Sequence, residues 1–413
     1  MAPEDFLPPS VFRLTDNKPF PPQRAQLDAS RTRVSLTKSP KPVPPANAPE
    51  LSSHNIFTDH MVCARWTASP GWDVPAILPH GPLTIPPSAS ALHYATACFE
   101  GMKAYRGHDG KLRLFRPQYN AARMLASAAR VSLPSFDPAQ LLHLIRQLCA
   151  LDAPRWLPAE SAAGSSLYIR PTLVGTDDSL GFQVPREALL YIIISYWPSP
   201  AAAGPGLSLW ASDGDTVRAW PGGSGSAKLA ANYGPSILAH SHARRKGCDQ
   251  VLWLFGSDGW VTEAGSMNVF VIWRTRQGQL QVVTPGLDEH TILAGVTRHS
   301  VLDLVRERLS GVEAASAHGI EPVEVVECIF TIHDIVTAAR EGRLVGLFAV
   351  GTAASVVPVR EIQFKEETIL VESSQSPYVS LLQGWMADIT SGREQSMWTE
   401  VVDEHPFHPG RLE

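Results

Sequence analysis

The stretch WPSPAAAGPG at residues 197–206 constrains the fold of this chain more than any other sequence feature. Proline, glycine and alanine at this density interrupt regular structure, as linkers between domains do. The 413 residues are enough for two domains that each bury their own core. We therefore expect an N-terminal arm at 1–48, a small N-terminal α/β domain at 49–196, an interdomain linker at 197–216 and a large C-terminal domain at 217–413.

The arm is rich in proline, serine and charged residues, so we expect it to be extended or disordered. Basic residues recur from Arg24 to Lys41, as in a mitochondrial presequence, but the acidic residues Glu4 and Asp5 come before them. The sequence favours a cytoplasmic location, with the mitochondrion as the alternative.

Both domains combine helix and strand patterns. The expected segments are, in order, a hairpin around the Asp109-Gly110 turn, a helix capped by Asn120, a helix opened by Asp137-Pro138, a strand at 189–195, a helix at 235–246, a hairpin of strands 251–255 and 267–273 around the Asp258-Gly259 turn, and a helix at 295–309. The fold class is α+β or mixed α/β, and the cleft between two such domains is a favoured ligand site.

Composition excludes several classes of function. The formal net charge of −5 provides no basic field for nucleic acid or an anionic membrane surface. No apolar run reaches the roughly 18 residues that span a bilayer. The five cysteines form no CxxC or CxxH pair, so we expect no metal site and no disulfides, and we expect all five thiols to be buried.

Lys228 stands alone in AWPGGSGSAKLAANYG, because it is the only formally charged residue from Ala219 to Ala243. Small residues let a backbone approach a ligand, and removal from water favours the neutral amine that Schiff-base chemistry needs. On spacing alone, the pattern favours a surface lysine at a loop tip, where the glycines only mark a turn. A phosphate-binding P-loop does not fit, because Leu229 follows the lysine.

Several long motifs, in a fixed order, resemble branched-chain aminotransferases, which are fold-type IV enzymes that use pyridoxal 5′-phosphate (PLP). They are LHYATACFEGMKAYRG (92–107), RLFRPQYNAARM (113–124), SLYIRPTLVGTDDSLG (166–181), SAKLAANYG (226–234), WVTEAGSMNVF (260–270), TILAGVTR (291–298) and GTAASVVPV (351–359). The resemblance implies a two-domain fold similar to D-amino acid aminotransferase, with PLP in the interdomain cleft.

The resemblance also implies roles for matching residues. Lys228 would bind PLP covalently and later move a proton between the substrate α-carbon and the cofactor. Glu263 would pair with the pyridine nitrogen, and Tyr233 would bond the phenolic oxygen. Ser266 keeps a hydroxyl where the family often has threonine.

Phosphate binding has a physical basis at the start of the helix expected from residue 295. Gly295, Val296 and Thr297 would offer backbone N–H groups and the helix dipole to an anion. By resemblance, Arg123 and Thr352 complete this phosphate site.

Substrate binding is implied for a second set of residues. Tyr168 and Arg170 lie two apart on an expected strand, so both point to one face. By resemblance, this pair and Tyr94 organise the substrate side of the cleft. Arg170 would bind the distal carboxylate of 2-oxoglutarate, and Phe99 would contribute an apolar wall. Backbone groups at Thr352 and Ala353 would hold the substrate carboxylate.

In the family, Tyr94 and the 180–182 loop reach across a dimer interface, so a homodimer is implied. Phe182 occupies a loop position that is usually small and aliphatic, and its ring would reshape the side-chain pocket. Ala354 and Val357 stand where mammalian members carry a CxxC pair, so that redox switch is missing.

The implied function is transamination of leucine, isoleucine and valine with 2-oxoglutarate. Three alternatives stay open: a transaminase of the same fold for another amine in specialised metabolism, for D-amino acids or for (R)-amines; a lyase acting on aminodeoxychorismate, although such lyases are shorter; and a PLP-binding protein without catalysis. Tyr94, Tyr168 and Arg170 favour the branched-chain interpretation. The expected partners are small amino and 2-oxo acids, neither nucleic acid nor membrane.

Overall fold

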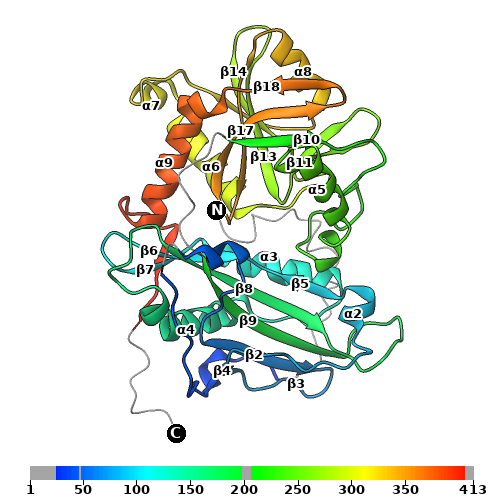
Figure 1. Cartoon of the computed structure of the whole chain (residues 1–413), viewed down its shortest axis with the longest axis vertical. Helices are drawn as coiled ribbons and strands as arrows, with labels where there is room; N and C mark the ends of the chain where they lie inside the picture. The colour runs from blue at the N-terminus through cyan, green and yellow to red at the C-terminus, as the bar shows by residue number, and fades with distance from the viewer. Residues whose placement is uncertain (1–24, 46–47, 198–205, 405–413) are drawn as a thin grey trace. The chain divides into compact units, whose positions relative to one another are not determined.

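A computed structural model describes residues 25–45, 48–197 and 206–404 (Figure 1). Contacts divide the chain into two compact units. The first comprises residues 1–199, 227–231 and 387–413, and the second comprises 200–226 and 232–386. The short segment that contains Lys228 and the C-terminal residues thus belong to the first unit, whereas we expected the large domain to run from 217 to 413.

A ten-stranded sheet forms the centre of the first unit (Figure 1). Its path is β1 (Arg33–Val34), β4 (Ala76–Pro79), β2 (His60–Thr67), β9 (Glu187–Trp197), β8 (Ser166–Gly175), β6 (Met102–Arg106), β7 (Leu112–Phe115) and β19 (Thr399–Val401), while β3 (Gly71–Trp72) pairs with β2 and β5 (Ala97–Phe99) pairs with β8. The pairing of β19 with β7 explains why the C-terminal residues belong here.

Alternation along the strands separates two faces of this sheet. Leu167 and Ile169 on β8, with Ile192 on β9, are fully buried in one core with residues of α3 (Pro117–Arg130) and α4 (Pro138–Trp156). The alternate side chains of β8, Tyr168 and Arg170, point to the opposite face of the sheet and are half-buried. The prediction that these two residues share a face is confirmed.

A nine-stranded sheet forms the centre of the second unit. Its path is β12 (Trp260–Ala264), β11 (Gln250–Phe255), β10 (Leu207–Ala211), β17 (Ser355–Phe364), β16 (Leu344–Gly351), β13 (Met267–Arg274), β14 (Leu280–Thr284) and β15 (Glu324–Glu327), with β18 (Glu367–Leu370) beside β17. A further pairing of β12 with β13 closes six of these strands into a ring. The helices are α5 (Ser236–Arg245), α6 (Val296–Arg308), α7 (Val312–Ser316), α8 (Ile332–Arg340) and α9 (Pro377–Ser391), of which α9 continues into the first unit.

Several local predictions are confirmed. Asp137 caps α4, with Pro138 in its first position, and its carboxylate accepts from Ala139 N at 2.8 Å. The expected helices at 235–246 and 295–309 are α5 and α6, and the strand at 189–195 lies within β9.

Three local expectations differ from the structure. Asn120 does not cap a helix, because α3 begins at Pro117, whose fixed φ suits a first helical position. The Asp258-Gly259 turn joins β11 to β12, and a second turn leads into β13, so this region has three strands rather than two. The part of the expected linker at 207–211 forms β10, a central strand paired in parallel with β11 and β17.

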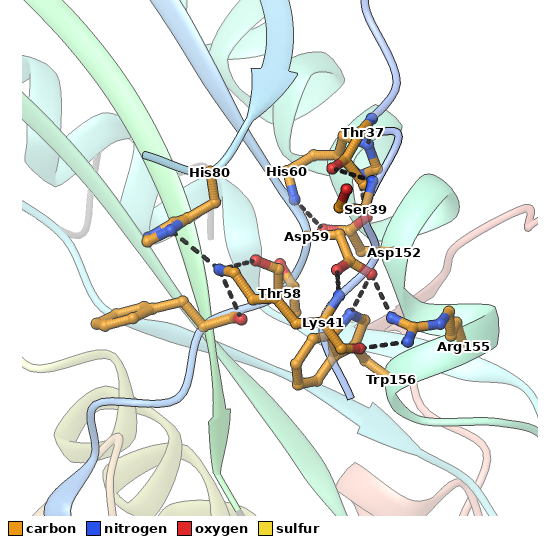
Figure 2. Close-up of polar contacts among 11 residues, drawn as sticks. Thr37, Ser39, Lys41, Thr58, Asp59, His60, His80, Asp152, Arg155 and Trp156 are labelled. Carbon is orange, nitrogen blue, oxygen red and sulfur yellow. Dashed lines mark hydrogen bonds and ion pairs between the residues drawn. The ribbon is translucent and has the colours of Figure 1, made fainter. Parts of the chain in front are cut away.

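Part of the expected N-terminal arm is bound to the first unit by a cluster of polar residues, here the Lys41 cluster: Lys41, Asp59, His60, His80, Asp152, Arg155 and Trp156 (Figure 2). The ammonium of Lys41 donates to the carbonyls of Phe57 and Thr58, at 3.3 and 3.0 Å, and contacts His80 Nδ1 at 3.1 Å. Asp59 accepts from Lys41 N at 2.8 Å. Residues 25–45 include a 3₁₀ helix (Ala29–Arg31) and the strand β1, and specific bonds hold this segment to the rest of the first unit.

The five thiols are all free. Cys98, Cys149 and Cys248 are buried as expected, whereas Cys63 and Cys328 are half-buried. None of the helices in the described ranges combines the length and the hydropathy of a membrane-spanning segment.

Candidate active site

Lys228 lies in the first unit, where two neighbouring elements hold its backbone. Its N–H donates to Ser127 Oγ on α3 at 2.9 Å, and its carbonyl accepts from the N–H of Phe99, at the end of β5, at 3.2 Å. The ammonium lies 5.1 Å from the centre of the Phe99 ring. The side chain is half-buried rather than fully removed from water.

A charge partner of this segment is Glu100, which directly follows β5 and is fully buried. Its Oε1 accepts from Arg123 Nε at 2.7 Å, and its Oε2 accepts from Arg123 Nη2 at 2.8 Å and from Asn120 Nδ2 at 2.9 Å. Burial would raise the pKa of the Glu100 carboxyl, but Arg123, Lys228 and Asn120 together lower it below its usual value. We call Glu100, Asn120, Arg123 and Lys228 the Glu100 group.

Tyr168 and Arg170, on β8, lie on the same face of the sheet as Phe99. Arg170 Nη2 donates to Tyr168 Oη at 3.2 Å, and the guanidinium carbon lies 4.7 Å from the centre of the Phe99 ring. Within the described chain, Arg170 Nε is buried and has no hydrogen-bond partner. A Cβ at Gly101 would lie 2.0 Å from Tyr168 Oη, so glycine is needed for the tyrosine to pack here. These contacts place Phe99, Tyr168, Arg170 and Lys228 in one continuous group.

Tyr94 and Phe182 form a separate pair in the first unit. Tyr94 ends α2 (Ser90–Tyr94), and its hydroxyl donates to the Leu180 carbonyl at 2.6 Å. Its ring packs edge-to-face on Phe182, with 5.5 Å between ring centres. Phe182 is nevertheless 91% exposed, so this loop presents an aromatic surface to solvent in the single chain.

Glu263 lies in the second unit on β12 and is buried, which excludes a surface acid at a turn. Its Oε1 accepts from Leu293 N at 2.7 Å and from Asn268 Nδ2 at 3.4 Å, and Arg218 Nη2 lies 3.2 Å from its Oε2. An ionised carboxylate accepts up to about four hydrogen bonds, so this arrangement leaves room for a further N–H donor.

Asn268 joins Glu263 to the start of α6. Its Nδ2 also donates to the Leu293 carbonyl at 2.9 Å, and a Cβ at Gly295 would lie 2.0 Å from its Oδ1. Gly295 is the N-cap residue of α6 and no side chain caps this helix, so the N–H groups that open it suit an anion. Within the second unit, Asn268 therefore contacts both the glutamate predicted for the pyridine nitrogen and the glycine that opens the predicted phosphate site.

The other predicted residues lie at turns of the second unit. Tyr233 follows a short 3₁₀ turn (Ala230–Asn232), Ser266 is exposed between β12 and β13, and Thr352 and Ala353 lie in the turn from β16 to β17. Their roles toward a cofactor or substrate stay predictions.

The sequence interpretation missed three residues of these groups: Glu100, Arg218 and Asn268. Glu100 and Asn268 lie inside the motifs that carried the resemblance, and Arg218 is the last charged residue before the uncharged stretch around Lys228. Arg218 Nε is also buried without a hydrogen-bond partner in the described part of the chain. Two arginines, Arg170 and Arg218, thus have a donor available for an anionic ligand.

Comparison with known proteins shows the family to which the chain belongs. Residues 97–362 match the family described as amino-transferase class IV. The mitochondrial branched-chain-amino-acid aminotransferase of Schizosaccharomyces pombe is 41% identical over 373 residues, which cover 89% of this chain and 84% of that protein. The cytosolic branched-chain-amino-acid aminotransferase of Ovis aries is 42% identical over 377 residues, covering 90% and 92% of the two chains.

Among solved structures, the branched-chain amino acid aminotransferase of Thermobaculum terrenum in its PLP form has the same fold, with a TM-score of 0.63 and 20% identity. The match covers 84% of this chain and 98% of that one. The family match and the fold thus define a class IV aminotransferase. Within that class, the chain belongs to the branched-chain-amino-acid aminotransferase family.

Proposed function

We propose that this enzyme transfers the amino group of leucine, isoleucine or valine to 2-oxoglutarate, which yields branched 2-oxo acids and L-glutamate. The observation that carries the proposal is the environment of Lys228: its backbone is fixed by Phe99 and Ser127, beside a buried glutamate–arginine pair. Relatives about 42% identical over most of the chain carry the branched-chain name.

The donor groups within each unit suit PLP by their chemistry. Bound PLP would supply an aldehyde that condenses with amines and a ring that takes up electrons from the substrate α-carbon. Lys228 would bond to that aldehyde and later carry the proton at the α-carbon. Glu263 would hold a proton on the pyridine nitrogen, and Tyr233 would donate to the phenolic oxygen.

The phosphate of PLP would bind at the start of α6, through Gly295, Val296 and Thr297, together with Arg123 and Thr352. The helix dipole and the cation both favour an anion. The fit is supported by the tight approach of Asn268 to Gly295, because this contact fixes the backbone that would bind the phosphate.

For the substrates, Arg170 would bind the distal carboxylate of 2-oxoglutarate, since its Nε is buried without a partner among the described residues. Phe99 and Tyr168, which contact Arg170, would accept the branched side chain of the other substrate. Thr352 and Ala353 would hold the substrate α-carboxylate through their backbone groups.

We also propose that the enzyme is a homodimer. The exposed apolar side chains Leu92, Tyr94, Leu180, Phe182 and Val184 gather on α2 and the loop near it, and a patch of this kind favours burial against a partner. Light scattering should give the mass of two chains, and Phe182→Asp should shift the protein toward one.

Lys228→Ala tests the enzyme class. The wild-type protein should show the absorbance of covalently bound PLP, and the variant should lack it. A wild type with no spectral change on addition of PLP would contradict the proposal.

Turnover with 2-oxoglutarate and a panel of L-leucine, L-isoleucine, L-valine, D-alanine and aromatic amino acids tests the substrate. We expect the three branched L-amino acids to react fastest. Turnover of D-amino acids or non-natural amines alone would establish the alternative instead.

A further inference from the structure

Glu100 is a buried charge to which the proposed reaction gives no role. Its carboxylate is fully buried and receives at least four hydrogen bonds: three from Arg123 and Asn120, and one from Gly101 N at 3.1 Å. A carboxylate in such a position costs free energy unless positive charge and donors surround it. The chain provides both, which raises the question of what this charge does.

The bonds of Glu100 link the elements that carry two proposed cofactor ligands. Arg123 and Ser127 lie four residues apart on α3, so both face the same neighbours. Arg123 is bound by Glu100, while Ser127 holds the backbone of Lys228. Phe99, adjacent to Glu100, holds the carbonyl of Lys228. A shift of Glu100 would therefore move both Arg123 and the Lys228 segment.

Building on the proposed function, we propose that Glu100 is a positioning residue for the cofactor: it fixes the Arg123 guanidinium that binds phosphate and stabilises positive charge at the Lys228 nitrogen. Glu100 touches neither the substrate nor the reacting atoms in this account. It acts through two residues that would.

The electrostatics agree with this arrangement. The titratable groups that interact with Glu100 in the described chain include Arg123, Lys228 and the buried thiol of Cys98. Burial acts to raise the pKa of the Glu100 carboxyl, but Arg123 and Lys228 help to hold it below its usual value. Burial, and then the charge of Glu100, raise the pKa of the Cys98 thiol. Cys98 therefore stays neutral, and the Glu100 carboxylate interacts electrostatically with Lys228.

The test is Glu100→Gln in the full-length protein, because glutamine keeps the shape, removes the charge and replaces one acceptor oxygen with an NH₂ group. We expect the dissociation constant for PLP to rise about 10- to 100-fold, as for a lost charged hydrogen bond. We also expect the pH at which the absorbance of covalently bound PLP titrates to fall by about one unit or more, because an opposite charge has been removed.

Glu404→Gln is the matched control. Glu404 accepts from Nη1 and Nη2 of the fully buried Arg106, at 2.6 and 2.8 Å, so the variant removes the same charge from another arginine pair of the first unit. It should lower stability while leaving the PLP dissociation constant and the titration midpoint unchanged. A purely structural role for Glu100 would give the same result in Glu100→Gln.

Asn120→Ala keeps the Glu100–Arg123 pair and removes one hydrogen bond, so it serves if Glu100→Gln does not fold. It should raise the PLP dissociation constant about 3- to 10-fold. A folded variant with the wild-type constant and midpoint overturns the inference. That outcome is distinct from failure of the proposed function, in which the wild type itself would carry no PLP.

Discussion

The Lys41 cluster and the Glu100 group of the first unit both centre on buried charged side chains, yet they differ in whether nearby donors are left without a partner. In the Lys41 cluster, the ammonium has three chain acceptors, and His60 uses Nδ1 on Asp152 and Nε2 on Thr37 N, at 2.6 and 3.0 Å (Figure 2). The cluster binds one part of the chain to another and needs no ligand.

In the Glu100 group, both carboxylate oxygens likewise accept hydrogen bonds, but a neighbouring arginine has a donor without a hydrogen-bond partner. Phe99 contacts both Lys228 and Arg170, and Arg170 Nε has no partner in the described chain. Buried donors without partners cost about 1–3 kcal/mol each, so they mark places where a ligand contributes what the chain does not. The comparison distinguishes charge that stabilises the fold from charge that, in our proposal, serves a ligand.

The largest effect is expected for Arg123→Met, because it leaves Glu100 buried without its main counter-charge. The free energy of unfolding should fall by about 3–5 kcal/mol, measured by urea denaturation. The double variant Glu100→Leu/Arg123→Met should recover most of the stability but not the affinity for PLP. Recovery of both would show that the pair is structural, like the Lys41 cluster.

Asp59→Ala should have the next largest effect, and on stability alone. It removes the acceptor of Lys41 N and of Trp156 Nε1, both at 2.8 Å, and leaves these donors unsatisfied. We expect a loss of about 2–4 kcal/mol with an unchanged PLP dissociation constant. A loss of PLP affinity in folded Asp59→Ala would remove the distinction between the two clusters.

The Lys41 cluster should also make stability depend on pH. Burial, and then the charge of Lys41, lower the pKa of His80 below the ordinary value, although Asp152 acts in the opposite direction. The unfolded chain therefore binds a proton that the folded chain resists, and the contribution of His80, complete above about pH 6.5, is lost as the pH falls below that value. His80→Asn, which keeps an acceptor for Lys41, should weaken this acid dependence in urea denaturation between about pH 7.5 and 5.5. An identical slope in both proteins would exclude His80 as its source.

The smallest effect is expected for Arg155→Ala. Arg155 forms an ion pair with Asp59, but its side chain is 43% exposed. Solvent screens such pairs, so the loss of stability should be about 1 kcal/mol or less. A loss as large as that of Asp59→Ala would mean that the arginine, rather than the backbone and Trp156 donors, is the main partner of Asp59.

Local signals predicted much of the fold. The Asp137-Pro138 cap, the three confirmed helices and the shared face of Tyr168 and Arg170 depend on residues close in sequence. The sequence does not predict the strand β10, because a short apolar run beside glycine and proline shows no alternation of apolar and polar residues. This segment is a strand because it pairs with β11 and β17, which lie further along the chain.

The candidate site was predicted in part for a similar reason. Lys228 was recognised from its isolation in the sequence, and the motifs around Arg123 and Glu263 supplied their roles by resemblance. Lys228 has no charged neighbours close in the sequence, whereas in the folded chain it interacts with Glu100, which lies 128 positions away in the sequence. The pairing of Arg218 with Glu263 also joins residues far apart in sequence. No local sequence pattern predicts such long-range partners.

The central claim, that the Lys228 amine bonds to the aldehyde carbon of PLP, is tested most directly by borohydride reduction of the purified protein followed by peptide mass spectrometry. The account predicts a pyridoxyl adduct on the peptide that contains Lys228 and on no other peptide. An adduct on a different lysine, or none at all in protein supplied with PLP, would contradict it.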